Sequence, residues 1–153
     1  LEVDGKKIPQ STAIARYLAK EFGFAGKTAF DAAWVDALAD QMKDYMGELR
    51  PYMMVVAGRA EGDKDKLRKE VGEPVRDKFF GIIEKQLTKT GSGYLVGDSI
   101  TWVDLFLADH VFTILSMDKT FLDAFPKVLA HKAKIYSHPK LKSYIEARAP
   151  TAF

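Results

Sequence analysis

The chain has 153 residues, of which 23 are Lys or Arg, 21 are Asp or Glu and none is Cys. This length supports one globular domain, with room for a fragment of a second. The charges are interspersed, which excludes the basic stripe typical of nucleic-acid binding, and the lack of Cys excludes disulfides, Cys-ligated zinc and a thiol nucleophile. No uncharged apolar run approaches the length of a membrane span, and no signal peptide is visible. We therefore expect a cytoplasmic protein with neither a nucleic-acid nor a membrane partner.

The first 22 residues predict a hairpin followed by a helix. Two short extended segments are joined at Asp4-Gly5, a dipeptide that favours tight turns. From Thr12 the apolar residues recur at helical spacing, so Ser11 is expected to cap the helix, which ends near Phe22-Gly23. A helix N-terminus with a free hydroxyl and the Gln10 amide beside it also suits a carboxylate ligand. Simple capping is the commoner role of such a Ser, and both interpretations stay open at this point.

Two long helices are predicted in the middle of the chain. Residues 23–29 have no periodicity and are interpreted as a linker, and a long apolar stripe begins at Phe30. Pro51 is expected to kink or end this helix, although apolar residues continue beyond it. A second long helix is predicted to begin at Pro74, a residue favoured at the first helical position, and to end at Gly91.

Three carboxylates lie on one face of the first long helix. Asp36, Asp40 and Asp44 recur every four residues. Such a spacing is most often a solvated helix face. The alternative is that one of the three meets a cationic group of a ligand.

A capping box is predicted before the most apolar helix of the chain. The spacing from Thr101 to Asp104 matches Ser/Thr-x-x-Glu with Asp in place of Glu, and Ile100 and Leu105 suit the accompanying hydrophobic staple. Ser99 is an alternative cap. The following residues are apolar nearly all round, as expected of a central core helix. Two short helices are predicted after it, at residues 127–136 and 139–148.

Common catalytic patterns are absent from the sequence. His110, His131 and His138 lack metal-ligand spacing and are interpreted as structural or surface residues, so no metal is expected. There is no Gly-rich phosphate loop and no nucleophile elbow.

Several motifs, in their order along the chain, resemble a cytosolic glutathione transferase, closest to the invertebrate branch of the sigma class. They are the hairpin, Pro9-Gln10-Ser11, residues 13–18, Val35-Asp36-Ala37 and residues 97–104. The resemblance covers essentially the whole chain. It implies a mainly α fold: an all-helical C-terminal domain at residues 30–153, a linker at 23–29, and the last β-hairpin and helix of a thioredoxin-like α/β domain at 1–22.

The resemblance also implies a binding site for glutathione as co-substrate. Gln10 and Ser11 match the pair that grips the γ-glutamyl end of the tripeptide. Asp44 matches a carboxylate that crosses the interface of a homodimer to the γ-glutamyl amine in the partner subunit. Candidates to line a pocket for the hydrophobic co-substrate are Met46, Phe106 and Phe153, although apolar residues on such helices are more often plain core.

The resemblance places the catalytic group outside this chain. In this class a Tyr near the first strand activates the glutathione thiol, and none of the six tyrosines present matches it, so that strand is expected upstream of Leu1. The expected function is conjugation of reduced glutathione to small hydrophobic electrophiles in detoxification, with this truncated chain inactive alone. The alternatives are a non-catalytic ligand-binding or structural protein on the same scaffold, or a glutathione-dependent prostaglandin isomerase.

Overall fold

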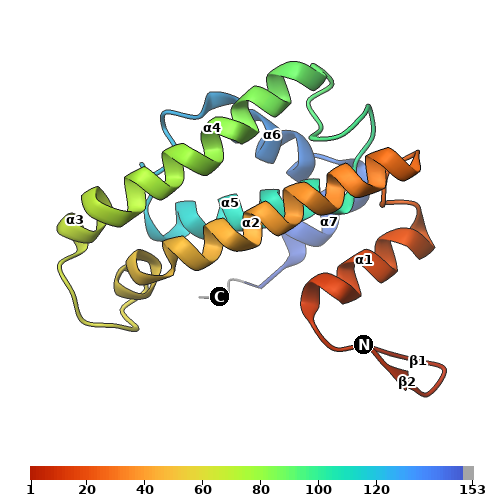
Figure 1. Ribbon diagram of the computed structural model, residues 1–153, viewed down its shortest axis with the longest axis horizontal. Helices are drawn as coiled ribbons and strands as arrows, with labels where there is room; N and C mark the ends of the chain where they lie inside the picture. The colour runs from red at the N-terminus through yellow and green to blue at the C-terminus, as the bar shows by residue number, and fades with distance from the viewer. Residues whose placement is uncertain (150–153) are drawn as a thin grey trace.

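The computed structural model describes residues 1–149 and is mainly helical, with one two-stranded sheet at the start of the chain (Figure 1). In chain order the elements are β1 (Glu2–Val3), β2 (Lys6–Lys7), α1 (Ser11–Phe22), α2 (Ala29–Val56), α3 (Lys64–Leu67), the π-helix η1 (Arg68–Gly72), α4 (Glu73–Thr90), α5 (Trp102–Met117), α6 (Pro126–Tyr136) and α7 (Pro139–Ala147). The expected fold class is confirmed. Within residues 1–149, no helix is both long enough and apolar enough to cross a membrane.

The hairpin forms where the turn signal predicted it. β1 and β2 pair antiparallel, and both turn residues have left-handed backbone, with φ of 49° at Asp4 and 76° at Gly5. Two successive left-handed residues give the turn whose twist matches that of the flanking strands. The hairpin projects from the helical body next to α1 (Figure 1).

The junction between α1 and α2 also follows the local signals. Gly23 ends α1 with a φ of 77°, and its N–H donates to the carbonyl of Ala19. The next helix, α2, begins at Ala29, one residue before the predicted start at Phe30, and Thr28 is its N-cap. The division into domains at residues 1–22 and 30–153 remains a prediction.

Pro51 does not end α2, which continues to Val56. Proline removes one backbone N–H, so the carbonyl of Gly47 loses its helical donor. Gly47 and Pro51 are both exposed, and water can therefore take the place of that donor. The apolar stripe beyond Pro51 stays helical because Tyr52 is fully buried in the core.

The core lies where α2, α4 and α5 pack together and is rich in aromatic rings. Tyr45 of α2 stacks on Phe79 of α4 with ring centroids 4.3 Å apart, and Tyr52 stacks on Phe121 at 5.4 Å. The fully buried side chains also include Met42, Leu49, Phe80, Ile83, Leu95, Leu107, Ile114, Leu122 and Ile135. In Figure 1, α2 and α4 run along one side of the bundle with α5 behind them, and α5 packs most closely against α6 and α2.

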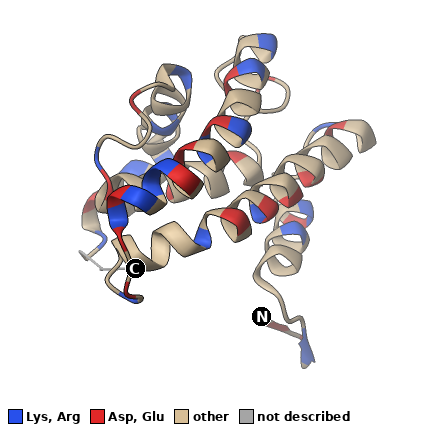
Figure 2. Cartoon of the chain, turned by 60° about the vertical axis from the view of Figure 1, so that its left-hand side comes forward, with Lys and Arg blue, Asp and Glu red and all other residues tan. Residues whose placement is uncertain are grey.

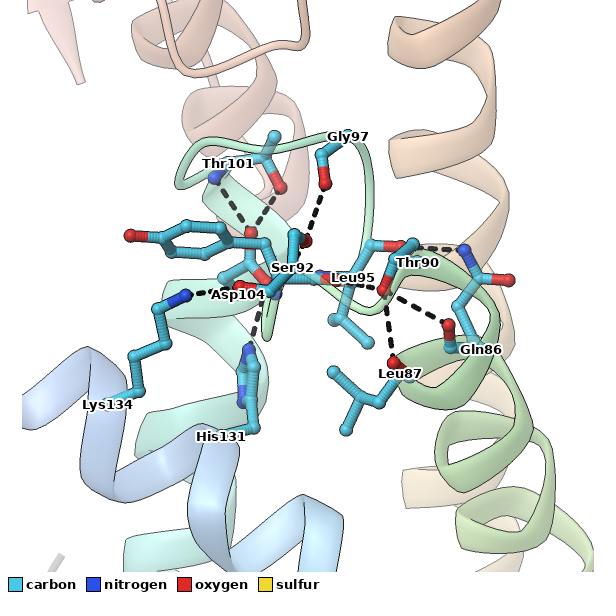
Figure 3. Close-up of polar contacts among 11 residues, drawn as sticks. Gln86, Leu87, Thr90, Ser92, Leu95, Gly97, Thr101, Asp104, His131 and Lys134 are labelled. Atoms are coloured by element: carbon cyan, nitrogen blue, oxygen red, sulfur yellow. Dashed lines mark hydrogen bonds and ion pairs between the residues drawn. The ribbon is translucent and has the colours of Figure 1, made fainter.

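A buried carboxylate joins the start of α5 to the preceding loop and to α6. Asp104 accepts hydrogen bonds from the N–H and hydroxyl of Thr101 at 2.8 and 2.7 Å, from the N–H of Leu95 at 2.8 Å and from Nε2 of His131 at 2.9 Å. Figure 3 shows Asp104 between Thr101 on one side and His131 on the other. Asp104 is fully buried. The capping box predicted at Thr101 is confirmed, and the structural role expected of His131 follows from this contact.

We expect Asp104→Ala to lower the free energy of unfolding by about 3–5 kcal/mol, because it leaves the donors of Leu95, Thr101 and His131 buried without an acceptor. The matched control is Asp31→Ala, which breaks the same kind of capping box at the start of α2 on the surface. Its expected cost is about 1 kcal/mol. Urea unfolding of both variants measures the difference, and equal losses would contradict a special role for the buried carboxylate.

His110 of α5 is held neutral by its surroundings. Its ring meets Tyr45 edge-on at 5.4 Å, and the Nε2 atom is buried with no hydrogen-bond partner among residues 1–149. Burial lowers the pKa of His110 to about 4, with the charge of Asp109 opposing the shift. Protonation of this ring is therefore linked to unfolding.

We expect the protein to lose stability as the pH falls from about 6.5 to about 4. In this window the unfolded chain protonates His110, whose ordinary pKa is about 6.5, while the folded chain does not, and the linked loss reaches about 3 kcal/mol. His110→Phe keeps the ring contact with Tyr45 but cannot titrate. Urea unfolding across this pH range should give a shallower pH dependence for the variant than for the wild type. Parallel curves would remove His110 from the effect.

Candidate functional site

The helix start at Gln10-Ser11 differs from the prediction by one residue. Ser11 is not the N-cap: it is the first residue of α1, and Gln10 occupies the cap position without a side-chain capping bond. The cause is that the N–H of Ile14 donates to the carbonyl of Gln10 at 3.0 Å, so the first helical turn closes one residue earlier. The Ser11 hydroxyl is therefore not used to cap α1 and is exposed.

Gln10 has a strained backbone. Its φ of 71° lies in the left-handed region, which a non-glycine residue without special constraint seldom adopts. A backbone strained in this way costs on the order of 1–3 kcal/mol, and residues with such strain are common at ligand-binding sites. The strained residue stands directly before a helix N-terminus whose first N–H groups have no helical acceptors and whose first turn contains no acidic side chain. This end of α1 is suited to bind an anion.

The three aspartates of α2 have different partners, although their spacing is identical. Arg16 of α1 forms ion pairs with Asp36, through Nε at 3.1 Å, and with Asp40, through a terminal guanidinium nitrogen. Asp44 forms no ion pair with any residue in the described part of the chain. Figure 2 shows acidic and basic residues interspersed along the helices, and the pairing with Arg16 leaves Asp44 as the unpaired member of its row.

Asp44 lines a small hollow between α2 and α4, of about 100 Å³. Tyr45 and Phe79 contribute aromatic surface to it, and the Nζ atom of Lys78 lies 3.0 Å from a carboxylate oxygen of Glu48 at its edge. Ser11 lines a different hollow, so Asp44 and Ser11 do not share a cavity of the single chain. This separation is compatible with the predicted role of Asp44 across an interface.

A larger apolar hollow of about 490 Å³ lies between α1 and α5, beside Ser11. Ala15, Leu18 and Phe22 line it from α1, and Trp102, Leu105 and Phe106 from α5. Phe106 packs against Trp102 with ring centroids 6.2 Å apart.

The outcome differs among the three residues predicted to line the pocket. It brings Phe106 and Ser11 to one hollow, whereas Met46, 37% exposed on α2, is not part of that lining. Phe153 lies outside the described residues. The described residues contain no group of three or more His, Asp or Glu side chains placed to share a metal ion.

Sequence reasoning missed Arg16. Its guanidinium group contacts two carboxylates of α2 and lies over the Trp102 ring, 5.7 Å from the centroid. One weak signal was available, an Arg within an otherwise apolar helical run, but helical periodicity does not report ion pairs between separate helices.

Comparison with known proteins identifies the protein family. Residues 48–148 match the family described as "Glutathione S-transferase, C-terminal domain". A relative named "Probable glutathione S-transferase 8" from Caenorhabditis elegans is 51% identical over 153 residues, which is all of this chain and 74% of the relative. The chain belongs to the glutathione S-transferase family.

Several solved structures are similar to this chain. Monomeric Na-GST-3, described as a glutathione S-transferase from the hookworm Necator americanus, is 51% identical with a TM-score of 0.93, over 99% of this chain and 74% of that one. A Nu-class glutathione transferase from Haemonchus contortus is also 51% identical, with a TM-score of 0.89 over the same shares. The glutathione-binding roles of Gln10, Ser11 and Asp44, and the pocket roles of Met46 and Phe106, remain predictions.

Proposed function

We propose that this protein acts as a glutathione transferase that conjugates reduced glutathione to small hydrophobic electrophiles, in detoxification and in the cytoplasm. The observation that supports the proposal most strongly is the start of α1. There a strained Gln10 precedes free helical N–H groups and an exposed Ser11 hydroxyl. Relatives of about half identical sequence that carry the name glutathione S-transferase support the same reaction.

In this proposal the α-carboxylate of the γ-glutamyl group accepts hydrogen bonds from the N-terminal N–H groups of α1 and from the Ser11 hydroxyl. The Gln10 amide offers one further acceptor and two donors to the same end of the ligand. Asp44 of a partner subunit accepts from the ligand's ammonium group, which agrees with the lack of an ion pair at Asp44 among the described residues of its own chain. The chain thereby binds the ligand at the end far from the sulfur.

Activation of the glutathione sulfur needs a hydroxyl donor, and the proposal assigns this role to none of the 153 residues. The glutathione thiolate attacks an electrophilic carbon. A hydroxyl group that donates a hydrogen bond to the sulfur stabilises the thiolate and raises the fraction of bound glutathione in that form. None of the six tyrosines matches the position of the family's activating Tyr, so the proposal assigns that hydroxyl to a residue outside these 153.

The test of the proposed function is a conjugation assay with glutathione and a generic aromatic electrophile. We expect turnover from the protein expressed from its complete reading frame and none above background from the 153-residue chain alone. A complete protein that binds glutathione but does not conjugate it would favour the non-catalytic alternative. Isomerisation of a prostaglandin endoperoxide without conjugation would favour the isomerase.

The class and the oligomeric state are further parts of the proposal. The motifs at Pro9-Gln10-Ser11 and residues 97–104 favour a sigma-like class, and the Nu class of the Haemonchus contortus relative is the competing assignment. We propose a homodimer because Asp44 has no partner in its own described chain and lines a hollow apart from Ser11. Because the hookworm relative is described as monomeric, the oligomeric state of this protein must be measured as well, by analytical sedimentation.

We expect Asp44→Ala to weaken glutathione binding by the complete protein by about 1–3 kcal/mol, since a charged group of the ligand loses its partner. The matched control is Glu48→Ala, one helical turn further along α2, where the carboxylate is paired with Lys78. That variant should bind glutathione as the wild type does. Isothermal titration measures both affinities.

Two results would remove Asp44 from the site. One is an unchanged affinity in Asp44→Ala. The other is an equal loss in Glu48→Ala, which would point to a general effect of charge on this face of α2. If the protein is a monomer and still binds glutathione with undiminished affinity, the proposal that Asp44 reaches the ligand of a partner subunit is wrong.

A further inference from the structure

A hollow of about 300 Å³ lies between the C-terminal end of α4, the loop that follows it and α6. We call it the α4–α6 hollow. All of its lining residues fall between residues 87 and 134, inside the stretch 48–148 that matches the C-terminal domain of the family. None comes from residues 1–22, the predicted remnant of the thioredoxin-like domain. In Figure 1 the end of α4 and α6 lie at the top of the view, whereas α1 and the hairpin lie at the lower right.

The lining of the α4–α6 hollow carries positive charge and no negative charge. Lys127 and Lys134 of α6 line it, and no Asp or Glu does. Neither lysine forms an ion pair with another residue in the range 1–149. Glu84, one helical turn before the hollow on α4, is used elsewhere, since its carboxylate accepts from the N–H of Val128 at 2.9 Å. The hollow is therefore suited to an anion.

Both ammonium groups are held in place by neutral groups. The Nζ atom of Lys127 donates to the hydroxyl of Thr88 at 2.6 Å. The Nζ atom of Lys134 donates to the carbonyl of Ser92 and lies 3.7 Å from the centroid of the Tyr94 ring. Figure 3 shows this side chain reaching from α6 toward Ser92. Neutral partners fix the position of a cation without cancelling its charge, and each ammonium group keeps further N–H donors for a ligand.

The spacing of the two lysines indicates the shape of the ligand. They are seven residues apart on α6, so they share one face of the helix and their Cα atoms are about 10 Å apart along its axis. The groups that hold them, on Thr88 and Ser92, are separated as well, by four residues around the end of α4. Between the lysines, Ala130 of α6 and Leu87 of α4 contribute apolar surface. The two cations therefore lie toward opposite ends of a mostly apolar hollow.

We propose that the α4–α6 hollow binds an elongated organic dianion, with one anionic group at Lys127, the other at Lys134 and an apolar chain or ring between them. Each ammonium group donates to anionic oxygens at its end, and Leu87 and Ala130 contact the apolar middle. A mostly apolar surface with a few placed polar groups is the usual construction of a small-molecule site. This site is separate from the proposed glutathione site, and the inference does not rest on the conjugation reaction.

The test is an NMR titration of the complete protein with nonanedioate, a linear dicarboxylate whose extended chain separates its carboxylates by about the spacing of the two lysines along α6. The amide signals of Gly91 and Gly93, which line the hollow, report binding. We expect saturable shifts of these signals. Nonanoate, with the same chain and one carboxylate, should bind about tenfold more weakly, because it loses one charged contact. Butanedioate is too short to reach both lysines and should also bind weakly.

Two variants test the lysines. We expect Lys127→Gln and Lys134→Gln each to weaken nonanedioate binding about three- to tenfold, and in each variant nonanedioate should lose its advantage over nonanoate. The matched control is Lys132→Gln, which removes the same charge from the same helix. Lys132 does not line the hollow, and its Nζ atom lies 4.7 Å from the centroid of the Tyr136 ring. This variant should bind nonanedioate as the wild type does.

Three results would overturn the proposal. The first is the lack of saturable shifts at Gly91 and Gly93 in the wild type. The second is equal affinity for nonanedioate and nonanoate, which would show that a second anionic group is not recognised. The third is an equal loss in Lys132→Gln, which would reflect the general charge of α6. The comparison of the three ligands uses the wild type alone, so it decides the proposal even if a variant fails to fold.

Discussion

The fold depends on the buried carboxylate of Asp104. An ionised group in a core is costly unless its oxygens are fully used, and here both oxygens accept two hydrogen bonds each. The donors come from Leu95 in the loop before α5, from Thr101 at the N-cap of α5 and from His131 of α6. Because α5 is apolar on nearly all sides, packing alone would determine its rotation poorly. The Asp104 contacts determine it instead, and with it the surface that α5 presents to α1 and α2.

A second constraint decides the charge pattern beside the candidate site. Asp36, Asp40 and Asp44 look equivalent along the sequence, and only the position of Arg16 on another helix makes them differ. Two of the three are neutralised within the chain. The third, Asp44, has no ion-pair partner among residues 1–149, and for this reason it alone of the row is suited to a cationic group that comes from elsewhere.

The candidate site itself is built from backbone more than from side chains. Gln10 adopts a left-handed φ, and the following helix offers N–H groups with no acceptor of their own. A strained residue at such a place persists only where the surroundings hold it. The pairing of Arg16 with α2 is one such restraint, and the end of α1 at Gly23 is another.

The sequence by itself determined those features whose causes are local. Asp4-Gly5 predicts its turn, Gly23 predicts the end of α1, and Thr101 with Asp104 predicts a capping box, because each depends on atoms a few residues apart. The Gln10-Ser11 motif likewise marked the candidate site, although its cap position was wrong by one residue. Only the tertiary structure decided which aspartate stays unpaired, that α2 continues through Pro51, and that Phe106 but not Met46 faces the hollow beside Ser11. These outcomes depend on packing between helices distant in the chain, and the periodicity of a single helix carries no information about its neighbours.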